Sequence, residues 1–423
     1  MNPATVEPDH TANVGVPFEQ EIEGVLGELR PALAAILEGL RPPVMRASEL
    51  QRLLGLDKKL SWSVYSAATT PDARALASLL PGRRAMERFF AASAQRGVPG
   101  AAIDRARAMY RRFEESVATH AGSRDAFETM VSEFGGAERE AGRGGGGGAA
   151  DLKHKRAAFR ATSLLWGRQA RVVCGARIMH PSAGPGGAGL LDTVFIKGMA
   201  GVRRTRRSVP LHTTAYRART VQPGGPAVVS PPEPLDPRET GPDAIGLLRD
   251  FCSRPLPEFR LRVSAQGYRC HELVSEHVGP SGEVTYFTGE AGRADTGVPG
   301  SVEGGGGWEL SLAKSVDIPI EVFMADVLMH RSVWGKRPPE VRVYATPMDG
   351  SLEFRETDLL PLAERAEYLG EGADAARTPL LPRYAEMLRY ATDRMGWNVE
   401  EFRVFRCRVD YPLLYSRIRV TLR

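Results

Sequence analysis

Residues 47–67 have the sequence ASELQRLLGLDKKLSWSVYSA, in which two short helical patterns meet at Leu54-Gly55-Leu56. Glycine at this bend permits a positive φ, which a tight turn between two helices requires. Asp57 follows the bend directly and can cap the second helix by accepting a hydrogen bond from a free backbone N–H group. The stretch therefore predicts two helices packed across a sharp corner.

The second helix of this pair divides into two stripes by its spacing. Leu60, Val64 and Ala67 form an apolar stripe that we expect to pack inward. The other stripe carries cationic, hydroxyl and aromatic side chains, which can contact phosphates and base edges when a helix lies in the major groove. The candidate DNA contacts of this helix are Lys58, Lys59, Ser61, Trp62 and Tyr65.

The pattern A-x-x-L-x-x-x-L-G-L at 47–56, followed by this polar helix, resembles the helix-turn-helix of bacterial transcriptional repressors and activators. The resemblance covers residues 47–67 only, and the rest of the chain resembles no characterised family. It implies a DNA-binding domain whose second helix contacts duplex DNA. Gln51 and Ser61 depart from the usual pattern, which leaves the crossing angle of the two helices open.

Two further observations support a polyanionic partner. Residues 41–120 contain fourteen Lys and Arg against seven Asp and Glu, and such a local excess favours binding to nucleic acid. Arg83 and Arg84, at the start of a later helix, are candidate contacts to the phosphate backbone. No hairpin pattern follows residue 67, so a wingless, all-helical form is expected.

An ordinary corner in a helical bundle remains the alternative for residues 47–67. Leu-Gly-Leu turns are common in such bundles, and Trp62 could equally pack beneath the helix expected at 83–95, because tryptophan is usually largely buried. On that interpretation the chain would be a structural or interaction protein.

Composition divides the chain into four parts. Residues 1–16 lack periodicity and are expected to be a disordered tail, whereas 17–134 are helical in character, with Pro31 expected to kink or divide the first helix. The sequence GGAEREAGRGGGGGAA, residues 135–150, is expected to be a linker, because consecutive glycines lose much backbone entropy on ordering. Residues 151–423 form the remaining domain.

This last domain combines helical and strand patterns without regular alternation. Several segments alternate with a period of two, as strands do, while 318–334 and 382–397 are predicted to be helices. The expected fold class is therefore α+β, with an N-terminal helical domain and a C-terminal α+β domain on a mostly antiparallel sheet. We expect the C-terminal domain to sense a small-molecule effector or to form a homodimer.

Other classes of function have little support in the sequence. No apolar run could span a membrane and the N-terminus lacks the pattern of a signal peptide, so a cytoplasmic protein without a membrane partner is expected. We expect no metal and no cofactor, because the cysteines form no CxxC pair and no nucleotide-binding loop is present. An enzyme is the alternative, and its candidate residues, whose proximity the sequence leaves open, are His180, Asp192, His271, Glu272 and His330.

Overall fold

The computed structural model divides the chain into two compact units, residues 1–150 and 151–423. It describes residues 18–124, 126–127, 130, 148–183, 189–215, 233–241, 244–263, 269–275, 277–297, 310–347 and 353–422. The expected tail at 1–16 and most of the expected linker at 135–150 lie outside these residues. The two units meet at residues 150 and 151, where the linker was predicted to end, and helix α9 (Gly148–Trp166) begins slightly earlier, at Gly148.

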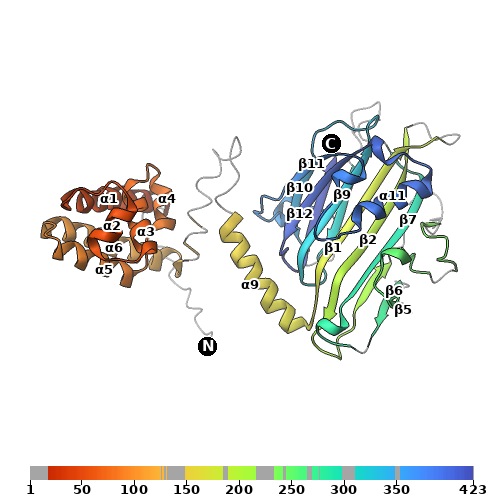
Figure 1. The fold of residues 1–423 in the computed structure, drawn as a ribbon, viewed down its shortest axis with the longest axis horizontal. Coiled ribbons are helices and arrows are strands. Elements are labelled where there is room, and N and C mark those ends of the chain that lie inside the picture. Colours follow the sequence, from red (N-terminus) through yellow and green to blue (C-terminus); the bar gives the residue numbers. More distant parts are fainter. Residues whose placement is uncertain are drawn as a thin grey trace, which may run out of the picture. The chain divides into compact units, whose positions relative to one another are not determined.

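Every regular element that the structure describes in the first unit is a helix, as predicted (Figure 1). The helix expected at 83–95 has those bounds, and the other expected helices up to residue 120 are also present. Pro31 neither divides nor ends the first helix, which is continuous around this exposed proline. The helices are α1 (Phe18–Gly39), α2 (Ala47–Leu54), α3 (Lys58–Thr69), α4 (Ala73–Leu79), α5 (Arg83–Gln95) and α6 (Gly100–His120).

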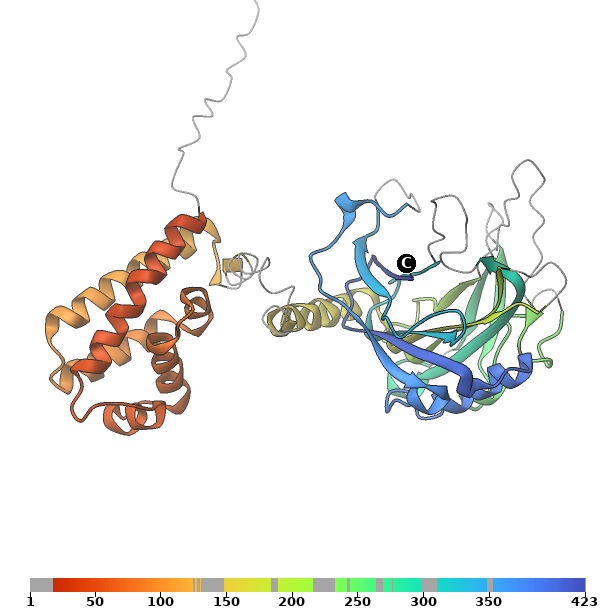
Figure 2. The same ribbon diagram turned by 90° about the horizontal axis from the view of Figure 1, so that it is seen from above.

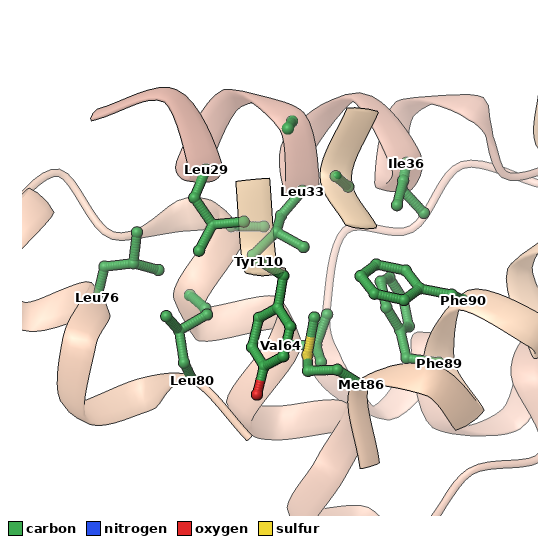
Figure 3. Close-up of a cluster of buried hydrophobic side chains, with 14 of the residues drawn as sticks. Leu29, Leu33, Ile36, Val64, Leu76, Leu80, Met86, Phe89, Phe90 and Tyr110 are labelled. Carbon is green, nitrogen blue, oxygen red and sulfur yellow. The ribbon is translucent and has the colours of Figure 1, made fainter. Parts of the chain in front are cut away.

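A single apolar core holds these helices together. Figure 3 shows side chains from the first, third, fourth, fifth and sixth helices converging on one cluster. Phe89, Phe90 and Phe113 are fully buried, and burial of such large side chains is a main source of stability. The inward stripe predicted for α3 is confirmed, because Leu60, Val64 and Ala67 belong to this core.

The second unit is α+β and is built on a seven-stranded, mostly antiparallel sheet with the order β11-β12-β9-β1-β2-β7-β4. Within the described strands, β1 and β9 form the one parallel pair. The strands of this sheet are β1 (Arg168–Pro181), β2 (Leu190–Arg204), β4 (Glu233–Pro234), β7 (Val284–Gly297), β9 (Ile320–His330), β11 (Ala366–Glu371) and β12 (Phe402–Asp410).

In the described part of this unit, two smaller sheets and three α-helices accompany the large sheet. One sheet has the order β10-β13-β8 and the other β3-β6-β5, both antiparallel. Their strands are β3 (His212–Ala215), β5 (Glu258–Val263), β6 (Arg269–Val274), β8 (Leu310–Ser315), β10 (Glu340–Ala345) and β13 (Ser416–Leu422). The helices are α9 (Gly148–Trp166), α10 (Gly372–Ala375) and α11 (Tyr384–Met395), with short 3-10 turns at Arg249–Phe251, Pro280–Gly282, Glu356–Asp358 and Val399–Glu401.

Each face of the large sheet has its own apolar core. Residues of α10 and α11 pack against one face, and Figures 1 and 2 show α11 running across that face. The opposite face packs against residues of the two smaller sheets, including Val343 of β10 and Ile418 of β13. The central strands are thus covered on both sides.

The helix predicted at 318–334 is wrong, because this segment forms strand β9. Nearly every residue of β9 is buried, since the strand lies between β1 and β12 with a core on each face. A strand buried on both faces is apolar without alternation, which makes its sequence resemble a buried helix. Consequently Asp326 and His330 are four residues apart on a strand, not one turn apart on a helix.

Candidate functional site

The bend between α2 and α3 has the local geometry that its sequence predicts. Gly55 has φ 65°, and its N–H donates to the Gln51 carbonyl oxygen at 2.9 Å. Asp57 caps α3, because its carboxylate accepts from the Leu60 N–H at 2.9 Å. This backbone hydrogen bond is the main cause of a lowered Asp57 pKa, and nearby Arg88 lowers that pKa further. The start of α3 is therefore fixed by its own sequence.

The outward surface of α3 carries two lysines and a tryptophan. Lys58 and Lys59 are exposed in the first turn, and Trp62 follows one turn later with 54% of its surface exposed. Trp62 therefore does not pack in the core beneath α5. An exposed indole beside two cations forms a surface that can contact phosphates through charge and a nucleic-acid groove through its ring.

Two of the expected contact residues point elsewhere. Ser61 is 1% exposed, and its hydroxyl donates to the Asp57 carbonyl oxygen at 3.0 Å. The expectation that Ser61 shares the outward stripe is thus wrong, because this position lies toward the core. Tyr65 is half-buried and donates its hydroxyl hydrogen bond to the Met45 carbonyl oxygen. The side chain packs partly against the helical core, and its hydroxyl is engaged within the protein.

Arg83 and Arg84 are exposed in the first turn of α5. A helix N-terminus has free N–H groups and a positive dipole end, so it disfavours cations and attracts anions. Two arginines at this position therefore lower the stability of α5 somewhat. They also add positive charge at a helix end that is suited to binding phosphate. Arg88, one turn beyond Arg84, forms an ion pair with Asp57 at 3.4 Å and joins α5 to the start of α3.

Met45 is an exposed residue that the sequence analysis missed. It is 73% exposed, and within the described part of the helical unit Met45 and Trp62 are the two large apolar side chains with high exposure. The Met45 backbone contacts Tyr65 of α3, so both exposed residues belong to the surface around this helix. Met45 precedes α2 and lies outside any periodic pattern, so no sequence signal marked it.

Three of the residues considered for an enzyme are neighbours in the second unit, because His180 is the cross-strand partner of Asp192 and its ring lies 4.7 Å from that of His330. Asp192 accepts hydrogen bonds from Arg293 Nη1 at 2.9 Å and from the Ala294 N–H at 2.8 Å, so its carboxylate has structural partners. His271 and Glu272 lie on β6, in a different sheet from His180 and Asp192. The structure does not bring the five residues together.

His180 and His330 do lie close together, with ring centroids 4.7 Å apart. The His180 ring stacks on Trp397 at 5.1 Å, and His330 Nε2 is 3.4 Å from Glu401 Oε2. Burial is the main cause of a lowered His330 pKa, which favours the neutral imidazole. Packing between these rings accounts for the positions of both histidines without assigning them a catalytic role.

No protein-family model matches the chain, and no curated protein does either. Across the described residues, no three His, Cys, Asp or Glu side chains are grouped to hold a metal ion. Within the same part of the chain, no helix has the length and apolar character needed to cross a membrane. The surface around α3 is therefore the most specific feature on which to base a function.

Proposed function

We propose that α2 and α3 form a wingless helix-turn-helix and that the protein is a transcriptional regulator that binds duplex DNA through α3. The observation that carries this proposal is the outward surface of α3, with Lys58, Lys59 and Trp62 exposed together. On this hypothesis the two lysines contact phosphates at the groove edge, while Trp62 approaches the bases. Arg83 and Arg84 would contact the neighbouring backbone from the start of α5.

The hypothesis also includes a homodimer. A single recognition helix contacts few base pairs, and two half-sites on one duplex multiply the specificity. We therefore propose that two chains bind one duplex. The C-terminal unit, which has its own cores, would provide the dimer contact and the site for an effector.

The test is a titration of the full-length chain against a pool of mixed-sequence duplexes at several salt concentrations. The affinity should fall steeply with salt, because each phosphate neutralised releases counterions. In the double variant Lys58→Gln/Lys59→Gln, the slope of log K against log salt should decrease by about two. The stoichiometry, measured by sedimentation velocity, should be two chains per duplex.

The matched control removes two positive charges from α6 instead. Arg105 and Arg111 are exposed on that helix, and Arg105→Gln/Arg111→Gln changes the net charge by the same amount. This control should keep the slope of the unchanged protein. If both double variants decreased the slope equally, binding would reflect nonspecific attraction by net charge. That result would contradict the proposal.

Binding of a protein partner is the second candidate function. Met45 and Trp62 both expose apolar surface, and the Met45 backbone contacts Tyr65 of α3, the helix that carries Trp62. Absence of any duplex binding at low salt would remove the DNA proposal. The same surface would then be explained by a protein contact.

A further inference from the structure

A row of small side chains crosses the large sheet of the second unit on the face opposite α11. The register of six neighbouring strands aligns Ala366, Cys407, Ala325 and Gly175, in that order, and continues to Lys197 and Thr288. The adjacent row contains the larger residues Phe323, Val173, Met199 and Tyr286. The sheet surface is therefore hollow along the small row.

Gly175 is the lowest point of this hollow. It lies in β1, the middle strand of the seven, yet it keeps partial contact with solvent. A Cβ atom built on Gly175 would have only the Ile196 carbonyl oxygen near it, at 3.9 Å. Glycine weakens a strand interior and often marks a place where another group approaches the backbone closely.

A cavity of about 210 Å³ lies over this hollow. Its floor is the large sheet, and its opposite wall comes from β8 and β13, through Leu312, Lys314, Ile418 and Val420. Space of this size holds about seven water molecules at their volume in the liquid. Packed interiors contain few voids larger than one water, so a gap between two sheets of this extent is unusual for a core.

The charges around the cavity are mainly positive. Arg177, Lys197 and Lys314 line it, and Lys197 Nζ is 3.1 Å from Glu290 Oε1 at its border. Of the two acids on the lining, Asp326 is held by a bidentate contact with Arg406, at 2.8 and 2.7 Å. The other acid, Asp317, is exposed. Three cations thus line the cavity against two acids, and one group of each sign is already engaged, Lys197 by Glu290 and Asp326 by Arg406.

We propose that this cavity binds a small organic anion, a carboxylate with an apolar chain, lying along the row of small side chains. The apolar walls would bury the chain, and Lys314 would hold the carboxylate. A mostly apolar pocket with a few charged groups is the usual form of a small-molecule site. Within the proposed regulator such a ligand would be the effector, although its binding does not require DNA.

The test uses octanoate as the probe, with octan-1-ol and octylammonium as neutral and cationic analogues of the same length. Isothermal titration calorimetry on the full-length chain should show saturable binding of one octanoate per chain. Octanoate should bind about tenfold more tightly than octan-1-ol, and octylammonium should bind more weakly than either. Binding of octan-1-ol at equal or higher affinity would overturn the anion assignment.

Two substitutions locate the site. Gly175→Val places a side chain on the cavity floor and should weaken octanoate binding by about tenfold or more. The matched control is Gly335→Val, since Gly335 is exposed and a Cβ atom there would meet nothing within 4 Å. It should leave the affinity within about twofold of the unchanged protein. Unchanged octanoate binding in a folded Gly175→Val variant would overturn the proposal.

A second pair tests the charge without filling the cavity. Lys314→Gln should weaken octanoate binding but leave octan-1-ol binding unchanged, whereas Lys336→Gln, outside the cavity, should change neither. This pair decides the proposal if Gly175→Val fails to fold, as judged by circular dichroism. No saturable octanoate binding, or equal effects of both lysine variants, would overturn it. Because no DNA is present, the outcome is independent of the proposed function of α3.

Discussion

Asp326 and Arg406 form an ion pair that the sequence could not reveal. The Asp326 side chain is fully buried on β9, and both of its oxygens accept hydrogen bonds from Arg406 of β12. Burial raises the pKa of Asp326, while the guanidinium opposes that shift by favouring the charged carboxylate. Since the two residues are 80 positions apart in the chain, no local pattern connects them.

Breaking this pair should be costly, because one charge would remain buried without its partner. We expect Asp326→Asn to lower the free energy of unfolding by about 3 kcal/mol in urea denaturation. The apolar double variant Asp326→Leu/Arg406→Met should lose less than the single variant, since neither charge remains.

The control for this prediction is the exposed pair Arg408–Asp410, which lies at 2.9 Å on the same strand β12. Solvent screens such a pair, so Asp410→Asn should cost less than about 1 kcal/mol. Similar losses for Asp326→Asn and Asp410→Asn would show that burial does not determine the contribution of the Asp326 pair.

At the scale of the elements, the helices were more predictable than the strands. The helical unit has local signals, such as the glycine bend before α3, and its expected elements are confirmed as far as they are described. Strand β9 was predicted as a helix because both of its faces are covered, a fact that depends on distant segments. The spacing placed Trp62 on the outward stripe but left packing beneath α5 as an alternative, since its exposure depends on where α5 packs.

The cavity was equally beyond prediction from the sequence. Its hollow row comes from six strands between residues 175 and 407, and each small residue is unremarkable in its own strand. Only the pairing register brings Gly175 beside Ala325 and Lys197. Register between strands that are far apart in the chain is set by tertiary packing, not by local propensity.

A pair of glycine substitutions tests the elements of the helical unit. Gly55→Ala places an L side chain at φ 65° and should destabilise this unit by about 1 kcal/mol. Gly27→Ala, on an exposed turn of α1 with nothing within 4 Å, should instead stabilise it by about 0.5–1 kcal/mol. The free energies come from thermal unfolding followed by circular dichroism. Effects of the same sign at both sites would contradict the bend geometry.

At the scale of the whole molecule, the two units have separate cores. The apolar cluster of the helical unit contains residues of that unit alone, and the two clusters of the second unit likewise contain only their own residues. Each unit therefore has an independent source of stability.

Differential scanning calorimetry of the full chain should accordingly show two unfolding transitions. Phe89→Ala, in the helical core, should lower the midpoint of one transition, with a loss of about 3–5 kcal/mol in that unit. Phe405→Ala removes a buried ring from the core of the second unit and should lower the midpoint of the second unit's transition. One cooperative transition that moves with either variant would contradict this independence.

The parallel pairing of β1 with β9 has a consequence for the order in which the chain can fold during synthesis. β1 and β2 are adjacent in sequence and can form an antiparallel hairpin as soon as residue 204 has left the ribosome. The other edge of β1 pairs with β9, so it stays unpaired until residue 330 has been synthesised. The far edge of β9 pairs with β12, which is synthesised later still. Until then an apolar strand edge is open, and such edges are templates for pairing with other chains. The nascent second unit therefore exposes this edge of β1 until β9 has been synthesised.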